Sequence, residues 1–125
     1  MTTMVCFRCA GADYCIPVHA TRAVRLAAGM IALPAANPDI AGIITGQPPL
    51  TVIAALGAGG SHILIIEAAD KTFGLLVEAV TGLRQVTDSQ IGPAPAGQNQ
   101  PLISGTIDDG SLVLITDPDA LAGRL

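Results

Sequence analysis

Residues 72–95 read TFGLLVEAVTGLRQVTDSQIGPAP, and the fold is best judged from this segment. Nearly every residue in it is apolar or small, and its only charged residues are Glu78, Arg84 and Asp88. Short runs of Val, Leu and Ile interrupted by glycine and polar residues are typical of β-strands joined by turns. Because the segment contains no cluster of reactive side chains, we interpret it as strand and surface, not as a catalytic loop.

The composition of the whole chain points to one small domain with an aliphatic core. The chain has 125 residues, which is enough for a single domain with a real core. Hydrophobic residues make up 50% of it but aromatic residues only 2%, so the core must be built from Val, Ile, Leu and Ala. Charged residues make up 13%, about half the share that is usual in soluble domains. This leaves two interpretations: an exposed apolar surface that binds a partner, or simply a well-buried apolar domain.

The charge pattern excludes some classes of protein. Six basic residues and a net charge of −4 argue against nucleic-acid binding, which requires a basic face. Residues 40–66 carry no charge, but Pro48, Pro49 and the glycines of residues 57–60 interrupt them, so no membrane span is predicted. The first residues show no signal peptide, and three cysteines fit a reducing compartment. We therefore expect a cytoplasmic protein.

Short apolar runs bounded by Gly, Pro, Asp or Asn recur along the chain and predict a mainly β protein. The predicted strands are residues 4–9, 14–18, 50–55, 63–68, 73–79, 102–107 and 112–116, and the predicted hairpin turns are residues 11–13, 69–71 and 108–110. Helix is scarce. Asn37-Pro38-Asp39 predicts a one-turn helix that closes at Gly42, and Asp117-Pro118-Asp119 predicts a short C-terminal helix.

The chain also contains a faint internal repeat. A shift of 59 residues places residues 4–9 over 63–68 and Arg25 over Arg84, and a shift of 63 places Gly42 over Gly105. We therefore expect a single domain over residues 1–125, built of two small β units over roughly 4–58 and 61–117. Five short twisted strands tend to close into a barrel, and two neighbouring barrels leave a groove that is suited to binding.

Candidate chemistry in the chain is weak. Cys6, Cys9, Cys15 and His19 have spacings that zinc or redox chemistry would permit. However, Cys6 and Cys9 lie an odd number of residues apart and would point to opposite faces of a strand. His19 and His62 lie outside any nucleophile motif, and G-x-S-x-G is absent. We predict no enzyme, no cofactor and no metal site, with a small metal or redox protein kept as a remote alternative.

Several motifs, in order, resemble the CheW family, the chemotaxis coupling proteins. GLLVEAV at residues 74–80 resembles the family's G-(I/L)-x-V-(D/E)-x-V. The resemblance extends over TDSQI at 87–91, PAP at 93–95, YCIPV at 14–18, LP at 33–34, IAGI at 40–43 and ISG at 103–105, and so covers nearly the whole chain. The motif residues that we single out as structural are Gly42, Gly74, Val77, Val80 and Gly105.

The resemblance implies a fold and a function. The expected fold is mainly β, with two intertwined SH3-like five-stranded β-barrels and short helices, one of them at the C-terminus. The expected function is that of a non-catalytic adaptor, which bridges the cytoplasmic tip of a chemoreceptor to the regulatory domain of a histidine kinase. The receptor's helical hairpin would lie in the groove between the barrels, and the kinase domain would pack on a barrel end. The residues that we assign to the receptor groove are Val24, Arg25, Thr45 and Gln47.

The chain departs from the family's pattern at charged positions. Gln47 stands where the family has an arginine, Ala55 where it has an aspartate, and Ala23 where it has a glutamate. Loss of interface charge affects partner choice and association rate more than the fold. An alternative is therefore a divergent protein-binding module of the same fold that no longer joins the receptor–kinase array and binds another protein or itself.

Overall fold

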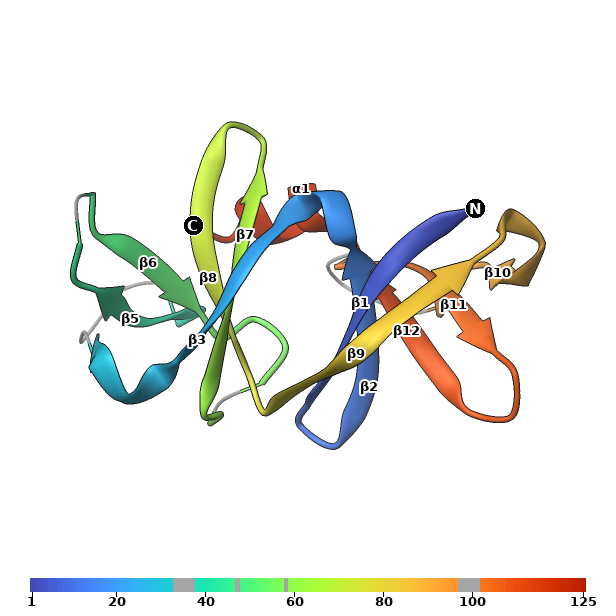
Figure 1. Ribbon diagram of the computed structural model, residues 1–125, viewed down its shortest axis with the longest axis horizontal. Helices are drawn as coiled ribbons and strands as arrows, with labels where there is room; N and C mark the ends of the chain where they lie inside the picture. The colour runs from blue at the N-terminus through green and yellow to red at the C-terminus, as the bar shows by residue number, and fades with distance from the viewer. Residues whose placement is uncertain (33–37, 47, 58, 97–101) are drawn as a thin grey trace.

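The chain forms two curled six-stranded sheets, with sheet A at the right and sheet B at the left of Figure 1. The computed structural model describes residues 1–32, 38–46, 48–57, 59–96 and 102–125. Sheet A has the hydrogen-bonded order β10 (Ile91–Gly92), β11 (Ile103–Asp108), β12 (Leu112–Thr116), β2 (Ala12–Pro17), β1 (Thr2–Cys9) and β9 (Ala79–Val86). Sheet B has the order β3 (Thr21–Leu26), β7 (His62–Ala68), β8 (Lys71–Val77), β6 (Leu50–Ile53), β5 (Ile40–Ile44) and β4 (Met30–Ala32). The prediction of a mainly β chain is confirmed.

The two halves of the chain repeat the same series of elements. Strands β1 to β6 correspond in order to β7 to β12, and the two sheets have the same strand order when equivalent strands are compared. Each sheet contains strands of both halves, because the hairpin β1–β2 lies in sheet A beside β9 and β12, while the hairpin β7–β8 lies in sheet B beside β3 and β6. The two halves are thereby intertwined, and neither sheet is built from one half alone.

This exchange explains why the central strands are apolar without alternation, as is typical of strands buried on both faces. On β1, Val5 and Phe7 belong to a central cluster, whereas Met4 belongs to the cluster inside sheet A. On β7, Leu64 belongs to the central cluster and Ile63 to the cluster inside sheet B. The central cluster draws residues from both sheets and so joins the two barrels.

The C-terminal helix α1 (Pro118–Ala122) is present as predicted. The Asp117 side chain caps it by accepting hydrogen bonds from the backbone nitrogens of Asp119 and Ala120, at 3.0 and 3.5 Å. The helix places Leu121 and Ala122 in the central cluster. None of the helices in the described part of the chain is long and apolar enough to cross a membrane.

Glycines of the repeat allow close approach of neighbouring strands. A Cβ added at Gly42 on β5 would lie 2.3 Å from the carbonyl oxygen of Ile31 on β4. At the equivalent Gly105 on β11, a Cβ would lie 3.0 Å from the carbonyl oxygen of Gly92 on β10. At Gly74 on β8, a Cβ would lie 2.5 Å from a methyl group of Ile63. These positions need glycine because a side chain would push a paired strand away.

The two valines of the GLLVEAV motif flank the point where β8 passes into β9. Val77 is fully buried in the central cluster, and Val80 packs against that cluster and pairs with Phe7 of β1. The predicted strand 73–79 therefore ends two residues early, at Val77, and the next strand begins at Ala79. Glu78 separates the two, and its backbone nitrogen donates to the carbonyl oxygen of Arg8 at 2.9 Å. The motif thus marks the crossing of the chain from sheet B to sheet A.

The helix predicted to close at Gly42 is wrong. Residues 38 and 39 form a turn, residue 37 lies outside the described residues, and Ile40–Ile44 form strand β5. Pairing on both sides, with β4 and β6, outweighs the local capping pattern, because an isolated helical turn is intrinsically unstable. The turn of the first hairpin also lies at Ala10-Gly11, slightly before the predicted residues 11–13.

Candidate protein-docking surface

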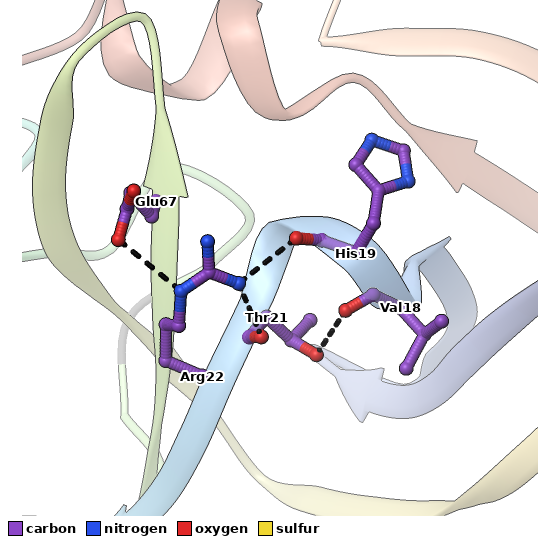
Figure 2. A network of polar contacts seen from close by, with 5 residues as sticks. All are labelled: Val18, His19, Thr21, Arg22 and Glu67. Atoms are coloured by element: carbon purple, nitrogen blue, oxygen red, sulfur yellow. Dashed lines mark hydrogen bonds and ion pairs between the residues drawn. The ribbon is translucent and has the colours of Figure 1, made fainter.

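Strand β3 begins at a crossing point that a polar network holds in place. The chain leaves β2 through the 3-10 helix η1 (Val18–Ala20) and enters sheet B (Figure 2). Arg22 donates from Nε to Oε2 of Glu67 on β7 at 3.1 Å, and from Nη1 to the carbonyl oxygens of His19 and Thr21 at 2.9 and 3.0 Å. Thr21 Oγ1 donates to the carbonyl oxygen of Val18 at 2.8 Å. The network orients the start of β3.

Beyond this network, β3 is an exposed strand at one end of sheet B. It pairs with β7 on one side, and the hydrogen-bonded order within the described residues places no strand on its other side. Residues 22–26 are all exposed; Val24 is 44% and Leu26 68% exposed. Ile31 on the neighbouring segment β4 is 48% exposed. Large apolar side chains on an open strand form a surface that favours a protein partner.

Arg25 follows Val24 on β3 but points to the opposite face of the strand from Val24 and Leu26, because successive side chains alternate. It differs from the other arginines. Four arginines form ion pairs within the described part of the chain: Arg8 with Asp13, Arg22 with Glu67, Arg84 with Asp109 and Arg124 with Asp39. Arg25 forms none with any described residue. Its equivalent in the repeat is Arg84, but the position equivalent to Asp109 in the first half is Gly46. The missing acid leaves the Arg25 guanidinium available to a carboxylate on another molecule.

The four residues predicted for the receptor groove are only partly brought together. Val24 and Arg25 share β3, whereas Thr45 is exposed just beyond the end of β5. Its neighbour Ile44 is in the buried cluster of sheet B and pairs with Met30, which packs against that cluster, so β4 is held against the end of β5. Gln47 lies outside the described residues.

The cysteines and His19 do not assemble a metal site. In the described ranges 1–32, 38–46, 48–57, 59–96 and 102–125, no group of three or more His, Cys, Asp or Glu residues could hold an ion. The buried Cys9 donates from Sγ to the carbonyl oxygen of Leu76 at 3.7 Å. Burial raises the pKa of the Cys6 and Cys9 thiols and raises that of Cys15 to about 12. The three thiols therefore stay protonated at neutral pH, which disfavours their binding of a metal ion.

An open pocket of about 310 Å³ lies in sheet A, and sequence reasoning did not find it. Residues of β1, β2, β9 and β12 line it together with the turn between β11 and β12. The ion pair of Arg84 with Asp109 lies at the pocket, as does that of Arg8 with Asp13 at 3.1 Å. The repeat identifies Arg84 as the counterpart of Arg25, and the sequence predicts only a turn around Asp109. Nothing in the sequence predicts the ion pair between Arg84 and Asp109.

Comparison with known proteins shows which family has this architecture. A family profile described as the CheW-like domain matches residues 48–125, which is more than half of the chain. No curated protein matches the sequence. Among solved structures, the scaffolding protein TtCheW from Thermoanaerobacter tengcongensis is similar, with a TM-score of 0.82 and 22% identity over 96% of this chain and 91% of that one. At this identity the likeness concerns the fold, and it confirms the predicted pair of intertwined SH3-like barrels, although each sheet has six strands and not the predicted five. The chain belongs to the family of CheW-like domain proteins.

Proposed function

We propose that this protein is a non-catalytic cytoplasmic adaptor, which couples the tip of a chemoreceptor to the regulatory domain of a histidine kinase. Family membership supports this function, as does the likeness of the fold to a protein described as a scaffold. The observation that carries the proposal is the exposed strand β3. It presents Val24 and Leu26 on one face and, on the other face, Arg25, which has no ion-pair partner in the described part of the chain.

The chemistry of β3 suits a helical partner with apolar and acidic side chains. Complete burial of a Val or Leu side chain contributes roughly 1.5–3 kcal/mol. A hydrogen-bonded ion pair between Arg25 and a partner carboxylate would add orientation and raise the association rate. Micromolar binding, which corresponds to about −8 kcal/mol, requires further contacts besides these, because Val24 and Leu26 are already partly buried and association itself costs several kcal/mol.

Binding of the wild-type protein is the first test. A receptor-tip fragment and a kinase regulatory domain from the same organism would be titrated against the purified protein by calorimetry. We expect dissociation constants of tens of micromolar or tighter. Failure of both to bind in this range would contradict the proposal.

A charge reversal on β3 tests the location of the receptor site. Arg25→Glu should weaken receptor binding at least tenfold, because it replaces the cation with a like charge for an acidic partner. Lys71→Glu is the matched control: it makes the same change of charge at an exposed position on β8, at the tip of the β7–β8 hairpin. Equal losses in the two variants would mean that net charge, and not the β3 surface, governs binding.

The second candidate is a CheW-like module that has left the receptor–kinase array. Gln47 and Ala55, which replace the family's arginine and aspartate, favour this reading. Ala55 is half-buried and packs against the central cluster, so Ala55→Asp would bury a carboxylate and complicate interpretation. Gln47→Arg is the cleaner test. A gain of receptor binding in Gln47→Arg would indicate a lost function, whereas no gain together with self-association in sedimentation experiments would favour a new partner surface.

A further inference from the structure

The Cys6-Phe7-Arg8-Cys9 motif is divided between the two faces of β1. Cys6 packs against the cluster inside sheet A, whereas Cys9 is buried elsewhere against the carbonyl oxygen of Leu76. Directly opposite Cys6 on β2 is Cys15, which belongs to the same cluster as Cys6. Cys6 is therefore not placed beside Cys9, its partner in the C-x-x-C motif. It lies directly opposite Cys15 on the adjacent strand.

The hairpin geometry shows which kind of cross-strand pair this is. The two turn residues, Ala10 and Gly11, both have positive φ (51° and 78°), as in a type I′ turn, so the residues flanking the turn exchange hydrogen bonds. Pairs along an antiparallel ladder alternate, which puts Cys6 and Cys15 in a non-hydrogen-bonded pair. Pro17 lies two residues beyond Cys15, so its pair with Met4 is also a non-hydrogen-bonded one. Proline fits there because it has no N–H to donate across the ladder.

Non-hydrogen-bonded pairs bring side chains close enough for a disulfide. Their Cα atoms lie about 4.5 Å apart, and disulfides form across Cα separations of about 4.4–6.8 Å. Both thiols are free in the structure. A disulfide between them would link β1 to β2 within the hairpin without any change in strand register.

Access to the pair is one-sided. Cys6 is half-buried and lines the open pocket of about 310 Å³, whereas Cys15 is fully buried and is not among the residues that line the pocket. A small reagent can therefore reach the Cys6 sulfur from the pocket but reaches Cys15 only through Cys6. This arrangement assigns the first, attacking role to Cys6 and the second, resolving role to Cys15.

We propose that Cys6 and Cys15 form a reversible cross-strand disulfide by exchange with a low-molecular-weight disulfide. The Cys6 thiolate attacks one sulfur of the reagent, forms a mixed disulfide and displaces one reagent thiolate. Cys15, after losing its proton to solvent, attacks the Cys6 sulfur and displaces the second thiolate. The displaced thiolates take up the two protons that the cysteines lost, so two protein thiols are oxidised and one reagent disulfide is reduced to two thiols.

The charges around the pair predict how the rate varies with pH. Burial raises the pKa of both thiols, Arg84 on β9 opposes this for both, and Asp13 on β2 raises the pKa of Cys6 further. Arg8 and Asp109 also line the pocket. Because the thiolate is the attacking form, exchange should be slow at pH 7 and accelerate as the pH rises.

The test uses the native full-length protein and cystamine as the disulfide. Chymotryptic cleavage after Phe7 and Tyr14 separates all three cysteines into different peptides, so each pairing is read directly by mass spectrometry. We expect the Cys6 and Cys15 peptides to be linked, and Cys9 to remain a thiol that is alkylated only after unfolding. In denaturant, the shorter loop between Cys6 and Cys9 should make that pairing compete strongly.

Two variants and the wild-type mapping keep the outcome clear. Cys9→Ser should still form the linkage, and Cys15→Ser should stop at a mixed disulfide on Cys6. A native-state bond between Cys6 and Cys9, a mixed disulfide that persists on Cys6 in the wild-type protein, or an unmodified Cys6 at pH 9 would each overturn the proposal. The peptide map of the wild-type protein decides the question even if a variant fails to fold.

Discussion

Gly74 on β8 is a central position where a single added methyl group should cost measurable stability. The strand lies between β6 and β7, and Gly74 pairs with Val52 on one side and Ile65 on the other. In Gly74→Ala, the new Cβ would lie 2.5 Å from Cγ2 of Ile63 and 3.3 Å from Cγ2 of Val52. Ile63 and Val52 are fully buried in the cluster of sheet B, so neither methyl group has free space to move into.

The expected loss follows from these distances. Non-bonded carbon atoms are optimally about 3.5–4.0 Å apart, so the contact with Ile63 is too short by roughly 1 Å. Overpacking of this kind costs typically 1–3 kcal/mol, and the reduced freedom of the unfolded chain offsets about 0.4–1 kcal/mol of it. We therefore expect Gly74→Ala to lower the free energy of unfolding by about 1–2 kcal/mol.

Urea denaturation of the wild-type protein and four variants measures this loss and its cause. Gly29→Ala is the control, because a Cβ there meets nothing within 4 Å and should leave stability unchanged or slightly raised. Ile63→Leu removes the obstructing Cγ2 at nearly constant volume, so the double variant Ile63→Leu with Gly74→Ala should be more stable than the sum of the two single changes by about 1 kcal/mol. The reasoning is refuted if Gly74→Ala is as stable as the wild-type protein, or if the two changes are additive.

The remaining predictions concern the turns, the helix cap and pH. Ala69 and Asp70 both have positive φ (51° and 60°), so Ala69→Asn, which suits a type I′ turn, should raise the free energy of unfolding by up to about 1 kcal/mol in urea titrations. Asp117→Ala removes the cap of α1 and should cost about 1 kcal/mol, seen as a lower melting temperature by calorimetry. Burial raises the pKa of Cys15 to about 12, so its thiol ionises in the unfolded chain before the folded one. Stability should therefore fall as the pH rises above about 9, by at most about 1.4 kcal/mol per pH unit from this group, and Cys15→Ala should show a shallower decline.

Local chemistry was sufficient to predict some elements. The Asp117-Pro118 cap specifies α1 because its donors and acceptor lie within a few consecutive residues. Hairpins closed by two-residue turns are similarly local, and the prediction of turns near residues 11 and 70 needed only small shifts. The correspondence of Arg25 with Arg84 also follows from residue spacing alone, because the internal repeat aligns the two positions.

Other features depend on pairing across long stretches of chain. Ile40–Ile44 form a strand and not a helical turn because β4 and β6 supply hydrogen bonds on both sides, which no local pattern reports. Likewise, residues 74–80 look like one apolar run, but the crossing at Glu78 divides it between two sheets.

The sequence by itself determined an aliphatic, strand-rich chain with an internal repeat and few groups for chemistry, because composition, residue spacing and repeats can be read along the chain without knowing which distant segments come into contact. Only the tertiary structure decided that Arg84 has an acid beside it while Arg25 has none among the described residues, and that Cys6 faces Cys15 and not Cys9. Both outcomes depend on strand register and on the distances between segments far apart in sequence, which folding sets through the packing of the whole core.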